Sequence, residues 1–271
     1  MSLINVTNLT FIYEGSYDPI FENVSFQIDT DWKLGFTGRN GRGKTTFLNL
    51  LLGKYEYSGT ISASVRFEYF PYEVPDKELD TMDVIKNICP HCPDWKIMRE
   101  ISLLDVSEDV LYRPFSTLSN GEQTRALLAA LFLEENSFLL IDEPTNHLDT
   151  NARKIVGDYL NRKKGFILVS HDRTFLDGCI DHILSINKTN LEIQKGNFSS
   201  WWQNKQLQDQ YELAQNEKLS RDIKQLSAAT KRTAQWSDQV EKSKYGIRNS
   251  GLRPDRGYIG HKAAKMMKRS K

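Results

Sequence analysis

The sequence lacks the features of several protein classes. Only three of its 271 residues are cysteines, which is too few for a disulfide scaffold. The longest apolar run, Ala126 to Leu133, is far too short to span a bilayer. The N-terminus has no basic region followed by an apolar stretch, so no signal peptide is expected. We therefore expect a cytoplasmic protein in a reducing environment, with no membrane segment.

Two of the cysteines lie in a C-P-H-C motif at residues 89–92. Such a motif is a thiol oxidant when it opens a helix in a thioredoxin-like unit, and it can also contribute to a zinc site. No such unit surrounds it, and no second cysteine pair accompanies it. Packing or turn formation is therefore the expected role.

Glycine and proline are absent from residues 199–245, where good helix formers dominate. Leu219, Ile223 and Leu226 follow the spacing of one helix face. This apolar stripe is thin, which is typical of one arm of an antiparallel helical hairpin. Residues 201–271 are therefore predicted to form a basic helical linker.

Charge is divided unevenly between the body and this tail. Residues 1–200 hold 20 Lys and Arg against 28 Asp and Glu, whereas residues 201–271 hold 16 against 7. A basic tail on an acidic body indicates an anionic partner.

We expect a hairpin tip at residues 246–257 and a return helix from His261 that is cut short, as in a fragment of a longer protein. A solvated linker remains the alternative to RNA contact, for which the candidates are Arg248, Arg253, Arg256, Lys262, Lys265 and Lys268.

The chain does contain a complete phosphate-binding loop, G-x-x-x-x-G-K-T. It follows a strand-like segment at residues 33–37 and opens a helix-like segment at residues 46–52, which is the setting that the motif requires. Its glycines let backbone N–H groups point at an anion, and the helix N-terminus adds its dipole. Lys44 is expected to reach the β- and γ-phosphates, and the Thr45 hydroxyl to ligate Mg²⁺. The candidate nucleotide-binding residues here are Gly38, Arg39, Asn40, Gly41, Arg42, Gly43, Lys44, Thr45 and Thr46.

An acidic pair, Asp142-Glu143, closes the continuous apolar run of residues 138–141. Such a run is typical of a strand buried on both faces of a parallel sheet, whose end lies beside the phosphate loop. Asp142 is predicted to hold Mg²⁺ and Glu143 to polarise the attacking water. A similar run at residues 166–169 follows a predicted helix at about 150–162, and this alternation indicates an α/β fold.

A third motif, L-S-N-G-E-Q at residues 118–123, begins a predicted helix. Alone it is a good N-cap, with Ser119 capping and Glu122 at the third helical position. With the other motifs it resembles the signature loop of the ATP-binding cassette (ABC) ATPases, with an asparagine in place of the first glycine. In that family this loop contacts the γ-phosphate of the nucleotide held by the opposing domain. The resemblance gives this role to Ser119, Asn120, Gly121, Glu122 and Gln123.

Two further segments resemble the ABC-F proteins, a soluble subclass of that family. Residues 146–149 read N-H-L-D, like the subclass's D-loop, and His171 matches the switch histidine that contacts the γ-phosphate. Tyr13 fits the family's adenine-stacking aromatic, with core packing as the alternative. The sequence departs from the family at Tyr72, where a glutamine normally links Mg²⁺ and the attacking water to a helical subdomain. Tyrosine is a poor Mg²⁺ ligand, so this change questions the metal role of the loop but not nucleotide binding.

The resemblance implies an α/β P-loop NTPase fold of the ABC type. Residues 1–200 are expected to form the nucleotide-binding domain, with a helical subdomain at about 76–130, and residues 201–271 the start of an interdomain linker. The chain is especially similar to the bacterial ribosome-protection subgroup. Membership implies ATP and Mg²⁺ as cofactors, and a second cassette in the same chain or in a homodimer. It also implies insertion into the ribosome, displacement of antibiotics from the large-subunit peptidyl-transferase region, and release on ATP hydrolysis.

Two other functions share these nucleotide motifs. The ATPase subunit of a membrane ABC transporter is the main alternative, although it does not account for the long basic helix. DNA-maintenance ATPases carry a coiled-coil arm between the phosphate loop and the signature, whereas here the helix follows the cassette.

Overall fold

The computed structural model describes residues 2–38, 41–187 and 190–242, with short helical pieces at 257–258, 260–262 and 264–265. The chain divides into two compact units after Gln203. The predicted loop residues Arg39 and Asn40 lie outside the described residues, as do all but the last residue of the predicted hairpin tip.

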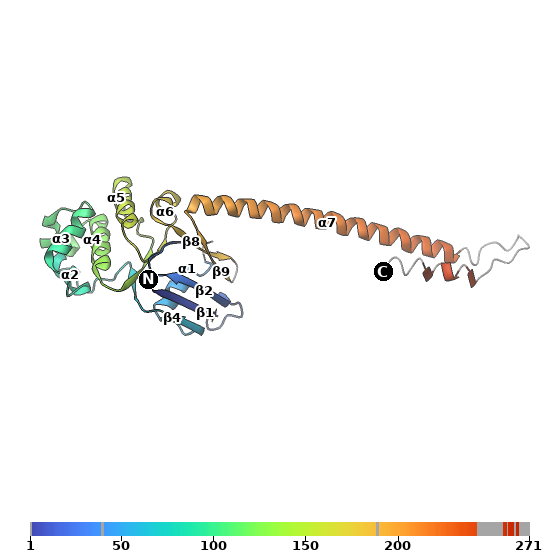
Figure 1. Ribbon diagram of the computed structural model, residues 1–271, viewed down its shortest axis with the longest axis horizontal. Helices are drawn as coiled ribbons and strands as arrows, with labels where there is room; N and C mark the ends of the chain where they lie inside the picture. Colours follow the sequence, from blue (N-terminus) through green and yellow to red (C-terminus); the bar gives the residue numbers. More distant parts are fainter. Residues whose placement is uncertain are drawn as a thin grey trace, which may run out of the picture. The chain divides into compact units, whose positions relative to one another are not determined.

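Nine strands and seven α-helices are present in the described part of the chain, with two short 3₁₀ helices (Figure 1). The strands are β1 (Leu3–Phe11), β2 (Phe21–Asp29), β3 (Lys33–Thr37), β4 (Ser58–Ser62), β5 (Arg66–Phe70), β6 (Ser137–Asp142), β7 (Phe166–Val169), β8 (His182–Asn187) and β9 (Asn190–Lys195). The helices are α1 (Lys44–Leu51), α2 (Thr81–Ile88), α3 (Asp94–Leu103), η1 (Glu108–Tyr112), η2 (Phe115–Thr117), α4 (Asn120–Leu133), α5 (Thr150–Asn161), α6 (Arg173–Cys179) and α7 (Phe198–Lys242).

The strands form two sheets in the first unit. The larger has the order β5-β6-β7-β3-β8-β9 and is parallel except for β9, which pairs antiparallel with β8 at the edge. The smaller sheet, β2-β1-β4, is antiparallel. The central strands β6 and β7 are the continuous apolar runs of the sequence, because both of their faces are covered. The predicted α/β fold is thus present.

Helix α1 packs between the two sheets. Its residue Phe47 is fully buried, and its ring lies 5.9 Å from that of Phe21 in β2 and 5.6 Å from that of Phe36 in β3. Helices α4, α5 and α6 contribute to a second hydrophobic cluster on the opposite face of the larger sheet. Helix α1, which follows the phosphate loop, is thus held by both sheets through the contacts of Phe47 with Phe21 and Phe36.

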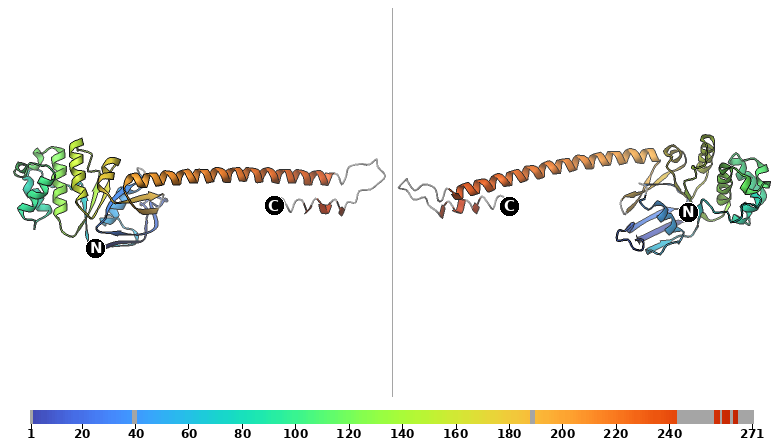
Figure 2. Two further views of the ribbon diagram at one scale, coloured as in Figure 1. Left: turned by 45° about the horizontal axis from the view of Figure 1, so that its top comes forward. Right: turned by 180° about the vertical axis from the view of Figure 1, so that it is seen from behind.

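A helical subdomain is built from α2, α3, η1, η2 and α4. Figure 1 shows α2 and α3 at one end of the first unit and the small sheet at the other, and the view from behind in Figure 2 agrees. Arg125 of α4 donates hydrogen bonds to the carbonyls of Leu104 and Asp105, at 3.0 and 2.8 Å. These bonds fasten the end of α3 to α4.

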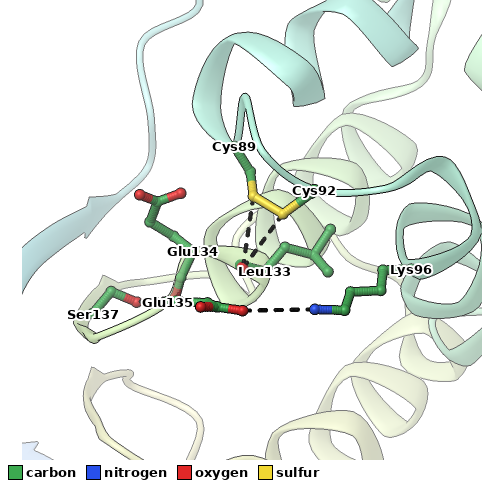
Figure 3. Close-up of a disulfide and its surroundings, with 7 residues drawn as sticks. All are labelled: Cys89, Cys92, Lys96, Leu133, Glu134, Glu135 and Ser137. Atoms are coloured by element: carbon green, nitrogen blue, oxygen red, sulfur yellow. Dashed lines mark hydrogen bonds and ion pairs between the residues drawn. A yellow bond between two sulfur atoms is a disulfide. The ribbon is translucent and has the colours of Figure 1, made fainter.

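The C-P-H-C motif joins α2 to α3 and contains a disulfide between Cys89 and Cys92 (Figure 3). The two sulfur atoms lie 3.6 and 3.5 Å from the carbonyl oxygen of Leu133, near the end of α4. An ion pair between Lys96 and Glu135, at 3.6 Å, runs beside them. The motif thus forms the expected turn, but it also carries a covalent bond that the turn prediction did not include.

Helix α7 is 45 residues long and begins in the first unit. Leu219, Ile223 and Leu226 are all more than half exposed, so the predicted apolar stripe is open along this part of the helix. Ser237, further along, is buried. Across the described ranges, no helix has the length and apolar character needed to cross a membrane.

Candidate nucleotide-binding site

A cavity of about 680 Å³ opens at the carboxyl edge of the parallel strands. Three segments meet there because they follow or end neighbouring strands: the phosphate loop after β3, the acidic pair at the end of β6, and the His171 segment after β7. The cavity is lined by Tyr13, Ile20, Gly41, Gly43, Lys44, Thr45, Thr46, Tyr69, Pro71, Asp142, Glu143, Val169 and His171.

The phosphate loop turns into α1 at Gly43, the N-cap residue. This glycine has φ of 96°, in the left-handed region, and a Cβ atom here would lie 2.5 Å from the Ile20 side chain. Only glycine meets both requirements, which explains the motif at this position. Lys44 donates a hydrogen bond to the Gly38 carbonyl at 2.9 Å. Burial lowers the pKa of Lys44, although the carboxylates of Glu143 and Asp142 oppose the shift.

The predicted Mg²⁺ ligands lie together. Thr45 Oγ1 donates to Asp142 Oδ2 at 3.4 Å, and the hydroxyl of Tyr69 donates to the same oxygen at 3.1 Å. A hydroxyl and a carboxylate are the hard oxygen donors that Mg²⁺ prefers, so this donor set fits the ion. Burial, followed by the charge of Asp142, raises the pKa of Tyr69 to about 12. Tyr69 therefore stays a neutral donor at physiological pH.

Glu143 and His171 face each other across the site. Glu143 Oε1 lies 3.4 Å from His171 Nε2, and Glu143 Oε2 accepts the backbone N–H of His171 at 3.4 Å. Burial raises the pKa of Glu143, and the nearby histidine opposes the shift. Glu143 Oε1 is buried and accepts no hydrogen bond within the described structure. This oxygen is therefore suited to accept a proton from a bound water.

Tyr13 lines the cavity and is 40% exposed. Its hydroxyl is 2.7 Å from Thr46 Oγ1 in α1. The rings of Phe11 and Tyr55 meet it edge to face, at 4.9 and 5.8 Å. These contacts fix the orientation of an aromatic face beside the phosphate loop.

Two of the five signature residues line another cavity. Ser119 and Glu122 form the predicted capping box, in which Glu122 N donates to Ser119 Oγ at 3.3 Å and Ser119 N donates to Glu122 Oε2 at 2.9 Å. A hydrogen bond from the Ser119 hydroxyl lowers the pKa of Glu122. Asn120 and Gln123 line a neighbouring cavity of about 530 Å³. The signature loop is thus not brought to the phosphate loop of its own chain.

The tyrosine that contacts Asp142 is Tyr69 and not Tyr72, the residue at the expected glutamine position. Tyr72, predicted at the glutamine position, is half-buried against the core of the helical subdomain and lines the second cavity. Tyr69 is the tyrosine that contacts Asp142, and it has no role in the sequence-based prediction. Its signal was its place near the end of β5, which pairs with the β6 strand that ends in Asp142.

The remaining predicted residues lie away from this cavity or outside the described ranges. Arg42 and Gly121 are respectively exposed and half-buried, and neither lines the cavity beside the phosphate loop. Lys262 and Lys265 are exposed, in short helical pieces. Four of the RNA-contact candidates lie outside the described residues: Arg248, Arg253, Arg256 and Lys268.

Comparison with known proteins gives the class to which this fold belongs. Residues 21–146 match the family model described as "ABC transporter". The dimeric structure of a bacterial ABC transporter cassette has the same fold, with a TM-score of 0.60 and 16% identity, over 71% of this chain and 98% of that one. The fold and the family match place residues 21–146 in an ATP-binding cassette of the ABC type, a class of domain that in general binds and hydrolyses ATP.

Among such cassettes, the similarity is to ABC-F proteins, as the sequence indicated. The chain is 31% identical to the ATP-binding protein Uup of Haemophilus influenzae, over 78% of this chain and 35% of that protein. It is 29% identical to ABC transporter F family member 3 of Arabidopsis thaliana, over 73% and 29% respectively. It is 33% identical to the ribosome protection protein VmlR of Bacillus subtilis, over 65% and 33%. The chain thus spans about a third of the length of these relatives.

Proposed function

We propose that this chain is the ATP-binding and ATP-hydrolysing cassette of an ABC-F protein that binds the ribosome and protects it from large-subunit antibiotics. The observation that carries the ATPase part is the convergence of three strand-end segments on one cavity. Lys44, the Thr45–Asp142 pair and the Glu143–His171 pair all line it.

The residues divide the work by their chemistry. The backbone of the phosphate loop and Lys44 bind the phosphates, because the N–H groups and the ammonium all present positive charge. Tyr13 supports the adenine with its fixed ring face. Thr45 and Asp142 would hold Mg²⁺, which when bound neutralises charge on the phosphates. Glu143 orients the attacking water through Oε1, which accepts no hydrogen bond in the described structure, and the His171 ring, 3.4 Å away, holds that carboxylate in place.

In this proposal the site is incomplete, because the signature loop that contacts its nucleotide comes from a second cassette. The Ser119 hydroxyl bonds Glu122 in the same loop, and its helix N-terminus lines the second cavity rather than the first. A second cassette, from a longer chain or a second copy, would supply the signature loop to this nucleotide. Asn120 and Gly121 would then bring the N-terminus of α4 toward the γ-phosphate.

Ribosome binding is supported by the segment on the C-terminal side of the cassette. A 45-residue helix comes directly after β9, and the residues beyond it are strongly basic. Phosphate contacts by lysine and arginine give affinity for RNA without base specificity. VmlR, one of the relatives, is named as a ribosome protection protein. Drug protection is the part of the proposal that rests on this relative alone.

Co-sedimentation with ribosomes tests the proposal. The chain carrying Glu143→Gln, which should hold ATP without turning it over, is mixed with bacterial 70S ribosomes and pelleted through sucrose with ATP, ADP or no nucleotide. We expect ATP-dependent pelleting that weakens as salt rises, because counterions compete for the phosphates. A matched chain ending at Gln203 tests whether α7 and the basic tail are needed. No pelleting under any condition, with ATP bound, would reject the ribosome function, and recovery only with a membrane permease would favour the transporter alternative.

A further inference from the structure

Arg173 opens helix α6 two positions after His171. Its guanidinium carbon lies 4.8 Å from the centroid of the Trp202 ring and 5.6 Å from that of Phe198. Those two rings are stacked, with centroids 6.1 Å apart and planes 12° from parallel. A guanidinium over an aromatic ring is attracted by the ring quadrupole, whose negative side lies at the ring face. Arg173 therefore holds the first two turns of α7 against the N-terminus of α6.

A second contact joins the same two helices one turn further along α6. Asp177 accepts the backbone N–H of Ser199 at 2.7 Å and also its hydroxyl. Ser199 is the second residue of α7, so this carboxylate satisfies an amide that the helix itself leaves without a partner. Negative charge at this point is also favoured by the helix dipole. With two contacts separated by a turn, α6 fixes the direction of the first turns of α7.

The N-terminal end of α6, where Arg173 lies, also borders the nucleotide site. Asp172 is the N-cap of α6, where it accepts the N–H of Phe175 at 3.1 Å, and it pairs with Arg153 of α5 at 3.3 Å. The residue before it, His171, is held by Glu143 through both its ring and its backbone N–H. One seven-residue helix thus connects the catalytic carboxylate to the base of α7, and all of these contacts lie within the first unit.

We propose that Arg173 is a positioning residue that couples the nucleotide contact of His171 to helix α7. When His171 contacts the γ-phosphate, its contacts with Glu143 change, and α6 shifts with His171. The first turns of α7 then move with α6, because Arg173 and Asp177 bind them. This coupling extends the proposed function by naming the contacts that connect the nucleotide site to α7. It rests on that function for one point only, which is that His171 contacts the nucleotide.

Fluorine NMR of the 271-residue chain labelled with 5-fluorotryptophan tests the coupling. The five tryptophans give separate signals, which are assigned by single Trp→Phe variants. Trp202 reports directly on the contact between Arg173 and α7. A non-hydrolysable ATP analogue with Mg²⁺ should shift the Trp202 signal of the parent chain. The shift should be lost in Arg173→Ala and in His171→Ala, although calorimetry should show that Arg173→Ala still binds the analogue with parental affinity. Arg162→Ala, which removes an exposed guanidinium from the end of α5, should keep the full shift.

Each other outcome has a defined meaning. A parental Trp202 shift in Arg173→Ala overturns the coupling. Analogue binding to the parent without any Trp202 shift also overturns it, while leaving the ATPase function standing, whereas a parent that does not bind the analogue removes the proposed function itself. If Arg173→Ala does not fold, Arg173→Lys decides: it keeps the charge but not the planar stacking, so a full shift opposes the proposal and a reduced shift supports it.

Discussion

Glu143 shows how backbone, charge and chemistry combine at a single residue. It has φ of 51°, a left-handed conformation that is uncommon for a residue with a side chain. That conformation is maintained by its backbone N–H, which donates to the Val169 carbonyl at 2.9 Å in the neighbouring strand. The backbone thus turns sharply directly after the Asp142 position, and the two adjacent carboxylates serve different partners. Strain of this kind is typical of functional positions.

The first prediction concerns Glu143 Oε1, which accepts no hydrogen bond in the described structure. Glu143→Gln should leave ATP affinity within about twofold of the parent and lower the rate of hydrolysis by roughly 100-fold or more, because an amide cannot take a proton from water. Calorimetry with ATP and a phosphate-release assay measure the two quantities. Glu192→Gln, on an exposed face of β9, is the matched control and should retain parental turnover. Unchanged turnover in Glu143→Gln, in a chain with measurable activity, would refute the catalytic role.

The second prediction concerns the aromatic face of Tyr13. Tyr13→Ala should weaken ATP binding by roughly five- to tenfold, since a stacked ring contributes about 1 kcal/mol. Tyr13→Phe should bind nearly as well as the parent, because it keeps the ring and loses only the hydroxyl contact to Thr46. Tyr17, 99% exposed in the loop that follows, provides the control Tyr17→Ala. Equal affinities for Tyr13→Ala and Tyr17→Ala would show that Tyr13 serves the fold alone.

At the scale of elements, a buried charge network joins the helical subdomain to the rest of the unit. Glu100 of α3 is 1% exposed and accepts hydrogen bonds from Tyr159 at 2.7 Å, Lys163 at 2.5 Å and Arg99 at 2.8 Å. Burial alone would raise its pKa, but the bonds from Lys163, Arg99 and Tyr159 outweigh burial and lower it. Helix α3 is thereby tied to the end of α5.

The third prediction is a pH dependence of this link. Because the folded pKa of Glu100 lies below its ordinary value of 4.5, its contribution is complete above that value and is lost as pH falls through the folded pKa. Glu100→Gln should lower the free energy of unfolding by about 3 kcal/mol at pH 7, because Lys163 loses a buried partner. Denaturant titrations between pH 7 and pH 3 should show this difference shrinking below pH 4.5. Glu135→Gln, which removes one side of the exposed pair with Lys96, should cost less than about 1 kcal/mol at every pH.

Much of the cassette was predictable because its elements carry local signals. The phosphate-loop strand, the apolar run of β7 and the capping box of α4 all occur at the predicted residues, since periodicity and capping act over a few positions. The contact between Tyr69 and Asp142 was not predictable, because it arises only when β5 pairs with β6. The Arg173–Trp202 contact was missed for the same reason, since it joins two helices separated by two strands. No propensity distinguishes such residues from others on an exposed face.

At the scale of the whole molecule, the proposed division of function follows the division of charge. The acidic body, residues 1–200, contains every described residue of the nucleotide site, and the basic tail follows it. A fourth prediction results: ribosome pelleting should fall steeply between 50 and 200 mM salt, by roughly tenfold for every few phosphates contacted, whereas ATP affinity should change much less. Filter binding and calorimetry at matched salt concentrations compare the two. Parallel losses would place ribosome contact on the cassette rather than on the tail.

The last prediction is that hydrolysis requires two cassettes. Ser119 and Gly121 lie at a helix N-terminus that does not line the phosphate cavity of the same chain, so in the proposed mechanism a second cassette supplies this loop, and for the 271-residue chain that is a second copy. Sedimentation velocity of the Glu143→Gln chain should show monomer without nucleotide and a dimer fraction with ATP and Mg²⁺, and the turnover of the parent should rise with the square of protein concentration at low concentration. Gly121→Asp should abolish both effects while leaving ATP affinity intact, because a carboxylate there repels the γ-phosphate that the loop would approach. Gly178→Asp, at an α6 position where an added Cβ meets nothing within 4 Å, is the matched control. Vigorous hydrolysis by a chain that sediments only as a monomer would contradict the two-cassette mechanism.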